Sequence, residues 1–369
     1  MKKLFRVSTV AMLLLALAVS VGLWGCSRET ATPVAPEAAN VSVDRSASNP
    51  TIRGVMNVQE RYTPALMADP DVIGTATTID ANGQPVVLLL VTSERARGGA
   101  PKMLDGTPVQ VLLTDRIVAM KSTTTGVSHT AKQVPPIKLG TSGGWTYDLA
   151  NGYCCAGTLG SLISVGGQKR ILSNYHVFES DIVSGGNGRV SATGDFIIQP
   201  GLIDINCSAA SGQNVATLVA SRALPNANVD ASTANIITGM VDATGNILEI
   251  GTISASTVAA SVGKAVKKSG RTTGLTRSSI SALNATISVA YENECAGGSA
   301  FTKTYTGQIV IANSRSKFLA GGDSGSLLVE DITTNPRAVG LLFAGSTTTA
   351  IANPIGQVLS YFGATMVGN

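Results

Sequence analysis

The chain has 369 residues, of which 44% are hydrophobic and 14% charged, so it can bury a substantial core and is not disordered as a whole. The formal net charge is +4, and Lys2, Lys3 and Arg6 supply three of these charges. The rest of the chain is close to neutral. Such a balance argues against a nucleic-acid binder that works by neutralising phosphates.

Residues 1–26 have the pattern of an export signal. The charged start is followed by an apolar stretch, residues 10–21, that is too short to span a bilayer comfortably. It ends in Leu-Trp-Gly-Cys, which resembles a bacterial lipobox, so we expect cleavage before Cys26 and acylation of its thiol. The alternative is an ordinary signal peptide cut nearby. We therefore expect a lipid-anchored protein of the cell envelope (outer membrane or periplasm in a Gram-negative cell), or else a secreted one.

Residues 27–50 are rich in Ala, Ser and Pro without aromatics, which is typical of a flexible tether. Residues 51–120 are expected to form a small α+β module that contains no histidine or cysteine. Near-helical spacing predicts a first helix through Ile52, Val55, Met56, Tyr62 and Leu66. Further elements are predicted as strands at 72–79, 86–91 and 109–113, a hairpin turn at Asn82-Gly83 and a short helix at 101–104.

After a linker at 121–135, residues 136–369 have the texture of an all-β domain. Short apolar runs alternate with Gly, Ser, Asn and Pro turns, a pattern typical of sandwiches and barrels. The 40 glycines and an aromatic content of 4% agree with many tight turns. The length suits two antiparallel six-stranded barrels.

The most informative motif is Gly-Gly-Asp-Ser-Gly-Ser at 321–326. A serine between glycines has an exposed hydroxyl, and glycine backbones let N–H groups converge, as a nucleophile with an oxyanion site requires. Alone, the motif also fits a simple β-turn. A lipase-type elbow would need glycine two residues after Ser324, where Ser326 stands. The stretch 314–317 matches the SxxK motif of β-lactamases, but no later Lys-Thr-Gly follows, so we regard it as chance.

Only two histidines can act as a general base. His176 ends an apolar strand beside turn residues, a suitable place for a catalytic side chain, although a lone histidine is often structural. His129 lies in a polar stretch without periodicity, and we interpret it as solvated.

A buried carboxylate could orient the base. Asp230 lies among small apolar residues, so we expect it to be partly buried and to need a partner such as an imidazole N–H. Asp204 is the rival candidate, and a plain turn aspartate is the structural alternative for Asp230.

His176, Asp230 and Ser324 occur in the chain order of chymotrypsin-type triads, not in that of hydrolases with serine first. The first two fall in the first half of the β region and the serine in the second, as a site between two barrels requires. The surrounding sequence resembles bacterial trypsin-like serine peptidases of the chymotrypsin fold, within them the group with a Leu-Ser-Asn-x-His-Val motif that is shared with plant proteins. The similar blocks lie at 157–160, 172–177, 199–201, 229–231, 268–274 and 322–326.

The resemblance implies a role for each residue. Ser324 attacks the scissile carbonyl, His176 moves the proton, Asp230 orients the imidazole, and the amides of Gly322 and Ser324 bind the oxyanion. It also implies a peptide or protein substrate and no cofactor. Departures from the group's pattern remove no triad atom; they are Tyr175, Ser232 and Ser326.

Four further cysteines follow Cys26, and an exported chain can form disulfides. Their spacing does not suit a zinc site and leaves all pairings open. The resemblance implies that Cys154 or Cys155 bonds with Cys207. The other member of the vicinal pair either meets Cys295 or stays free.

The resemblance also locates a substrate pocket, with Phe318 at its base and Phe343 and Gly345 on the facing wall. Residues 306–322 contain no acid, so a buried Arg or Lys would lack a counter-charge there. We therefore expect cleavage after apolar or small residues. Lys317, turned into the pocket, would instead favour an acidic residue.

Together these features predict an exported, membrane-tethered serine endopeptidase that works through an acyl-enzyme, with no nucleic-acid partner. Two alternatives are a peptidase-fold lipoprotein that binds a partner without turnover, and a serine esterase with the same triad. We interpret the module at 51–120 as a spacer, with a pro-domain that covers or steadies the cleft as the alternative.

Overall fold

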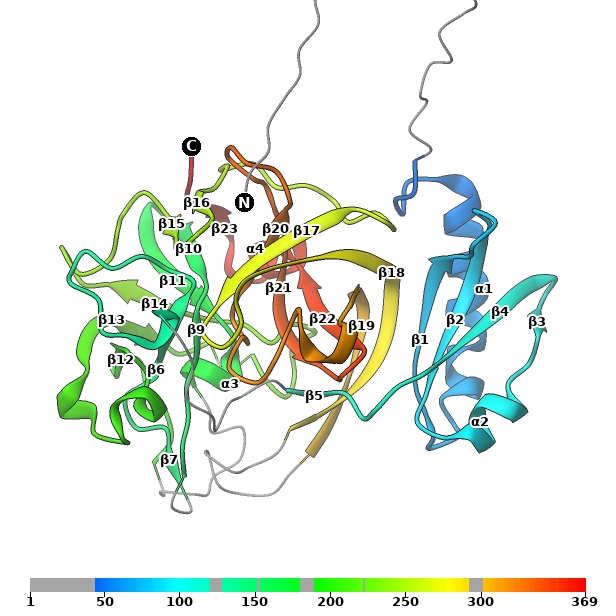
Figure 1. The fold of residues 1–369 in the computed structure, drawn as a ribbon, viewed down its shortest axis with the longest axis horizontal. Coiled ribbons are helices and arrows are strands. Elements are labelled where there is room, and N and C mark those ends of the chain that lie inside the picture. Colours follow the sequence, from blue (N-terminus) through cyan, green and yellow to red (C-terminus); the bar gives the residue numbers. More distant parts are fainter. Residues whose placement is uncertain (1–43, 120–127, 151–152, 180–188, 222, 292–300) are drawn as a thin grey trace, which may run out of the picture. The chain divides into compact units, whose positions relative to one another are not determined.

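The computed structural model describes residues 44–119, 128–150, 153–179, 189–221, 223–291 and 301–369 (Figure 1). Their strands form an 11-stranded sheet, an 8-stranded sheet and two 2-stranded sheets, which confirms the expected mostly-β class. No helix within these ranges is both long enough and apolar enough to cross a membrane.

The first helix, α1 (Pro50–Leu66), packs on the strands that follow it. The Asn49 side chain caps it by accepting a hydrogen bond from the Thr51 amide at 2.9 Å, and Pro50 supplies a helical φ at the first position. Its buried face consists of Ile52, Val55, Met56, Gln59 and Thr63. The next elements are β1 (Val72–Ile79), β2 (Pro85–Val91), α2 (Glu94–Gly99), β3 (Met103–Leu104), β4 (Thr107–Leu113) and β5 (Val118–Ala119).

The short helix expected at 101–104 is wrong, because Met103–Leu104 is strand β3 and the helix α2 lies earlier. Ser93 explains the position of α2, since its side chain accepts a hydrogen bond from the Ala96 amide at 3.2 Å. The hairpin turn at Gly83 is confirmed: its φ is 80° and β1 pairs with β2.

The 8-stranded sheet has the order β23-β10-β11-β14-β13-β12-β6-β9. Gly160 alone separates β9 from β10, so the sheet curls back on itself. A Cβ on Gly160 would lie 2.0 Å from the Gly325 carbonyl oxygen, and only glycine permits this approach. The strands are β6 (Thr141–Trp145), β9 (Gly157–Leu159), β10 (Ser161–Val165), β11 (Gln168–Ser173), β12 (Phe196–Gln199), β13 (Gln213–Val219), β14 (Ser232–Ile236) and β23 (Ala364–Met366). The short helix α3 (Tyr175–Phe178) follows β11.

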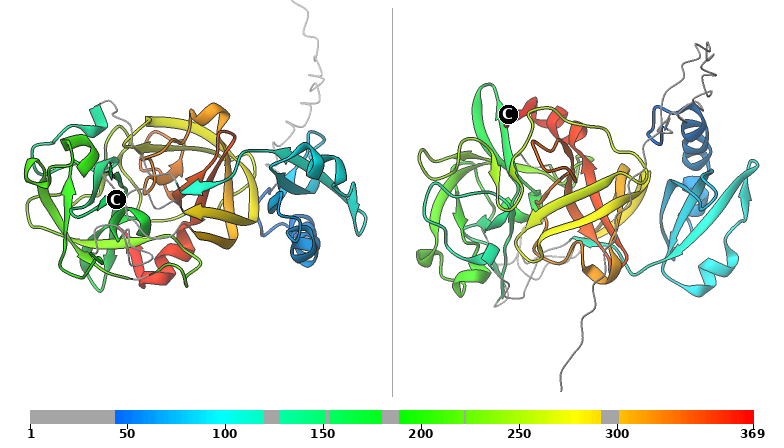
Figure 2. Two further views of the ribbon diagram at one scale, coloured as in Figure 1. Left: turned by 90° about the horizontal axis from the view of Figure 1, so that it is seen from below. Right: turned by 45° about the horizontal axis from the view of Figure 1, so that its top comes forward.

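In the larger sheet, β17, β20, β21, β22, β19 and β18 pair in that order, and β18 pairs back with β17 (Figure 2). The long strand β18 also pairs with β1, which continues the sheet into β2, β4 and β3. The strands are β17 (Ala265–Gly270), β18 (Gly274–Tyr291), β19 (Phe301–Ala312), β20 (Leu327–Glu330), β21 (Ala338–Gly345) and β22 (Thr349–Pro354). The helix α4 (Ile355–Phe362) precedes β23, and β7 (Leu149–Ala150) with β8 (Tyr153–Cys154) and β15 (Asn246–Ile247) with β16 (Gly251–Thr252) form the small sheets. The remaining helices are single 3-10 turns: η1 (Ser128–Thr130), η2 (Leu202–Ile205), η3 (Ala209–Ser211) and η4 (Ser314–Ser316).

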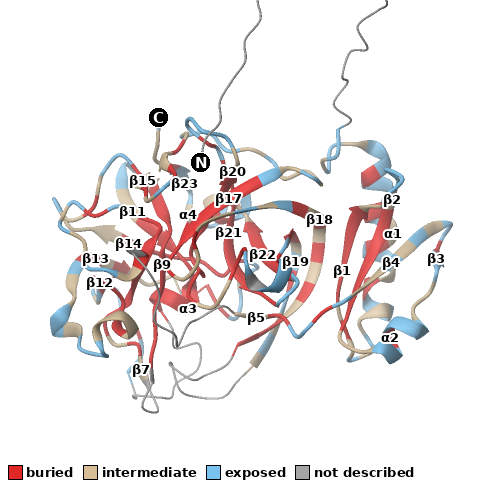
Figure 3. Ribbon diagram, in the orientation of Figure 1, coloured by how far each residue is buried: buried red, intermediate tan, exposed pale blue. Residues whose placement is uncertain are grey.

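One hydrophobic cluster joins the two large sheets. It contains Leu159 and Leu172 from the first sheet together with Leu327 and Leu341 from the second. Figure 3 shows buried residues along α3, β9 and β21, where the sheets meet. The candidate site residues therefore lie on elements that a common core holds in place.

The expected pairing with Cys207 is confirmed, and the vicinal residue that forms it is Cys154. Cys155 is also disulfide-bonded, so the alternative of a free thiol at this position is wrong. Cys295 lies outside the described residues.

Candidate active site

His176 and Asp230 are in direct contact. The imidazole Nδ1 lies 2.6 Å from Asp230 Oδ2, and the His176 backbone N–H donates to Oδ1 at 3.3 Å. Both residues are buried, with 5% and 0% of their surface exposed. Because a carboxylate accepts at Nδ1, the neutral ring carries its proton there and offers the Nε2 lone pair as a base.

Strand pairing brings these two residues together. β11, which leads into α3 and His176, pairs with β14, which begins just after Asp230; the register joins Ser173 to Ser232. The side-chain amide of Asn174 then donates to the Asp230 carbonyl oxygen at 2.6 Å. This bond ties the start of α3 to the aspartate backbone.

Two buried tyrosines, which the sequence analysis missed, support Asp230. The Tyr291 hydroxyl donates to Asp230 Oδ2 at 2.8 Å and lies 2.5 Å from the Tyr305 hydroxyl. Burial, and after it the charge of Asp230, raises the pKa of Tyr291 well above its ordinary value, so the phenol stays protonated and can donate. Tyr291 lies on β18 and Tyr305 on β19, and no local sequence pattern distinguishes them from ordinary core residues.

Asp204, the rival candidate, binds a different partner. Arg271 donates to it through Nε at 2.8 Å and through Nη2 at 2.5 Å, a two-pronged ion pair in which both side chains are almost fully buried. Ser142 Oγ adds a third hydrogen bond at 2.5 Å. The structure thus brings Asp230, and not Asp204, to His176.

Ser324 lies in a turn that requires glycine on both sides. Gly322 and Gly325 have φ values of 95° and 93°, in the left-handed region that favours glycine. A Cβ on Gly325 would also lie 2.4 Å from the Thr158 carbonyl oxygen. The Ser324 hydroxyl donates to the Phe343 carbonyl oxygen at 3.2 Å, which places β21 beside it.

The histidine helix and the serine turn meet at Gly157. A Cβ there would lie 2.5 Å from the Val177 side chain and 3.0 Å from the Ser324 carbonyl oxygen. The Thr158 amide donates to that same oxygen at 2.8 Å. Glycine at this position therefore lets the serine turn approach the neighbour of His176.

The backbone around Ser324 offers two available donors. Across the ranges that the structure covers, neither the Gly322 amide nor the Ser324 amide donates a hydrogen bond. The Thr158 hydroxyl donates to the Gly322 carbonyl oxygen at 2.9 Å and so fixes the turn. Two N–H groups beside a serine hydroxyl are the donor set that an oxyanion needs.

A buried ion pair stabilises the turn that contains Ser324. Lys268 Nζ lies 3.1 Å from Asp323 Oδ2, and both side chains are 0% exposed. Asp323 also accepts hydrogen bonds from the amides of Thr272, Thr273 and Ala320. Burial lowers the pKa of Lys268, while the Asp323 charge opposes that shift.

Replacing Lys268 by methionine should lower the free energy of unfolding by about 3–5 kcal/mol, because it leaves the Asp323 charge buried without its counter-ion. Urea unfolding followed by tryptophan fluorescence measures this change. Arg277→Met is the matched control, since its ion pair with Asp331 is 57% and 25% exposed and should contribute less than about 1 kcal/mol. Equal losses in the two variants would mean that the buried pair does not stabilise the turn.

The expected pocket residues lie close to the serine turn. Phe318 is 3% exposed, and Phe343 packs its ring 4.9 Å from that of Tyr305. Asn313 connects the segments of Phe318 and Ser346, because its side chain accepts from the Phe318 amide at 3.0 Å and donates to the Ser346 carbonyl oxygen at 2.7 Å. Gly345 precedes that serine at the end of β21, and Lys317 is exposed.

The interpretation of His129 as solvated is wrong, because it is 2% exposed. Its Nδ1 lies 2.8 Å from the Gly140 carbonyl oxygen and its Nε2 lies 2.5 Å from Glu249 Oε2. These contacts with distant residues satisfy both ring nitrogens, which a local polar sequence could not reveal.

A family model described as the Nal1 C-terminal domain matches residues 190–353, a stretch that contains Asp230 and Ser324 but begins after His176. No curated protein matches the sequence.

The chain is similar to three solved structures, each at low identity. A glutamic-acid-specific serine protease is 19% identical over 62% of this chain and 100% of its own, with a TM-score of 0.39. Protease A of Thermobifida fusca is 21% identical over 63% and 99%, with a TM-score of 0.40. The chymotrypsin of Cellulomonas bogoriensis is 21% identical over 63% and 99%, with a TM-score of 0.38.

Proposed function

We propose that the chain is an exported serine endopeptidase, tethered to the cell envelope through a lipid on Cys26. The observation that carries the catalytic part is the 2.6 Å contact between His176 Nδ1 and Asp230 Oδ2, next to a serine turn with two available amides. The tether rests on the sequence of residues 1–26, which lie outside the described residues.

The proposed reaction has two stages. Ser324 Oγ attacks the scissile carbonyl carbon while His176 Nε2 takes the hydroxyl proton, and the oxyanion accepts hydrogen bonds from the amides of Gly322 and Ser324. His176 then gives the proton to the leaving amine, and the acyl group stays on Ser324 as an ester. Water attacks that ester, His176 takes a proton from the water, and the proton returns to Ser324. Asp230 keeps the imidazole in the required tautomer and stabilises its charged form.

A fluorophosphonate probe tests the catalytic proposal on the full chain. We expect the wild type to be labelled on Ser324, Ser324→Ala to resist labelling, and the control Ser279→Ala, at an exposed position of β18, to be labelled like the wild type. Absence of labelling in the wild type would support the alternative of a binding protein without turnover. Comparing turnover of casein with that of a nitrophenyl ester then separates a peptidase from an esterase.

We expect cleavage after apolar or small residues. Phe318 and Phe343 are buried, and no acid lies in residues 306–322 to pair with a basic side chain. A hydrophobic pocket discriminates by only about 1–3 kcal/mol per methylene, so the preference should be broad. A peptide-library profile measures it. Dominance of Arg or Lys before the scissile bond would contradict the expectation, and dominance of Glu would implicate Lys317.

A further inference from the structure

The two-residue strand β5 occupies an unexpected position. It lies at the end of the module at 51–120, yet it pairs with β21 and β18, which come much later in the chain (Figures 1 and 2). With β21 it is antiparallel, Ala119 facing Ala344 and Val118 facing Gly345. With β18 it is parallel at Ala290, whose amide also donates to the Ile117 carbonyl oxygen at 3.1 Å.

The register of this pairing leads to the candidate nucleophile. From Val118 to Ala119, β5 advances along β21 from Gly345 to Ala344. The next residue of β21 in that direction is Phe343, whose carbonyl oxygen accepts the hydrogen bond from Ser324 Oγ at 3.2 Å. β5 therefore runs toward Ser324 with its carboxyl end leading. The acyl side of a peptide substrate must approach in the same direction, because the serine attacks the carbonyl group that ends that side.

We propose that β5 holds the place of the acyl side of the substrate on the edge of β21. The substrate is then an extended peptide that adds to β21 as an antiparallel strand and competes with Val118 and Ala119 for it. This inference rests on the proposed peptidase function and adds an internal competitor for the substrate strand.

The side chains of this segment indicate which peptides compete best. Ile117 is 0% exposed and belongs to the hydrophobic cluster that contains Tyr291, Tyr305 and Phe343. A substrate with a branched apolar residue at the corresponding position regains this burial, whereas a charged residue there loses it. The favoured class is therefore an extended apolar segment, with small or branched side chains along β21.

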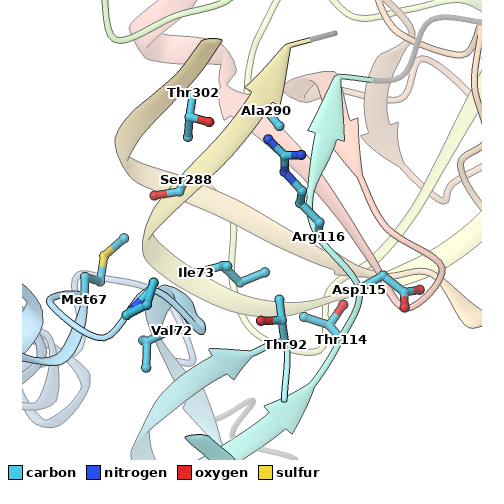
Figure 4. A pocket seen from close by; sticks show the side chains of 11 residues that line it. Met67, Val72, Ile73, Thr92, Thr114, Asp115, Arg116, Ser288, Ala290 and Thr302 are labelled. Atoms are coloured by element: carbon cyan, nitrogen blue, oxygen red, sulfur yellow. The ribbon is translucent and has the colours of Figure 1, made fainter. Parts of the chain in front are cut away.

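Side-chain hydrogen bonds fix the chain just before β5. The Thr114 hydroxyl lies 2.8 Å from Ser346 Oγ and 2.6 Å from Thr348 Oγ1, and the Thr347 hydroxyl donates to Asp115. A cavity of about 550 Å³ lies beside this segment. In Figure 4, Arg116 extends toward Ala290 of β18, and Ser288 and Thr302 line the opposite side. Asp115 and Arg116 are exposed, in contrast to the buried Ile117. β5 pairs with β21 over only two residues, so its exchange for a substrate strand breaks few backbone hydrogen bonds.

Two probes of different reach test this inference on the full-length protein. A small fluorophosphonate needs only Ser324, whereas a tetrapeptidyl phosphonate with the sequence Ile-Val-Ala-Met, copied from residues 117–120, also needs the edge of β21. Val118→Pro removes a backbone donor and disfavours pairing, while Val118→Ala leaves the backbone unchanged as the matched control.

In Val118→Pro we expect the peptidyl probe to inactivate Ser324 about tenfold faster than in the wild type, the order expected for loss of about one backbone hydrogen bond with its pairing. The fluorophosphonate rate should stay within about twofold, and Val118→Ala should resemble the wild type. An unchanged or slower peptidyl rate, with normal fluorophosphonate labelling, would overturn the inference. If neither probe labels the wild type, the peptidase proposal itself fails, which is a different result.

A second variant covers the case in which Val118→Pro does not fold. Cysteines at the facing positions Ala119 and Ala344 should form a disulfide that holds β5 in place. In Ala119→Cys/Ala344→Cys we expect the oxidised form to resist the peptidyl probe, to accept the fluorophosphonate, and to regain peptidyl labelling after mild reduction. The wild type under the same reductant controls for its own disulfides. Equal peptidyl rates in the oxidised and reduced forms would overturn the inference.

Discussion

Alanine at Ser324 or at His176 is expected to abolish hydrolysis, leaving at most a background of about 10³–10⁴ over the uncatalysed rate. Ser324→Ala removes the attacking oxygen, and His176→Ala removes the base that takes its proton. Both variants keep the two amides at the serine turn, so oxyanion binding and substrate positioning account for the residual activity. The rate constant kcat for a peptide substrate measures the loss.

The two losses should not add. The double variant is expected to be no slower than either single variant, because each removes the same proton-transfer step. His129→Ala is the informative control for the histidine, since it deletes a buried imidazole that contacts Glu249 and lies outside the proposed reaction. That variant should lose stability and keep its kcat. Hydrolysis that persists in Ser324→Ala at near wild-type rate would rule out this serine as the nucleophile.

The motifs that could be predicted from the sequence are those whose chemistry is local. The turn around Ser324 needs φ values near 95° at Gly322 and 93° at Gly325, so glycines on either side of the serine are visible in any reading of the chain. His176 was identified for a similar reason, as one of only two histidines and beside turn residues. Strand β1 was predicted over Val72–Ile79 because its apolar residues and the following turn are contiguous.

The features that were missed depend on partners distant in sequence. Asp204 lies in the 3-10 turn η2 and Asp230 in a loop, and their local sequences do not tell which one binds the histidine. The ion pair of Asp204 with Arg271 separates their roles. Tyr291 supports Asp230 from the end of β18, where its sequence neighbours give no hint of the contact. The pairing of β5 with β21 joins residues more than 200 positions apart, and no periodicity encodes it.

Loss of the tyrosine hydroxyl should lower kcat less than loss of the Asp230 carboxylate. Its Oδ2 accepts hydrogen bonds from His176 Nδ1 at 2.6 Å and from the Tyr291 hydroxyl at 2.8 Å. Tyr291→Phe removes one of these donors and leaves the imidazole contact. Because a hydrogen bond to a charged group contributes about 1.5–3 kcal/mol, kcat should fall by roughly 10- to 100-fold.

Asp230→Asn is expected to lower kcat by about 10⁴-fold with little change in the fold. The amide is isosteric, but its NH₂ group can donate toward Nδ1 and so favours the tautomer that carries the proton on Nε2, where it cannot act as a base. Asp204→Asn is the matched control, because it makes the same chemical change at the rival position, where Arg271 is the partner. That variant should lose stability through the weakened ion pair and keep most of its kcat. The reverse outcome, a near-normal rate in Asp230→Asn and a large loss in Asp204→Asn, would show that the third member of the triad has been misassigned.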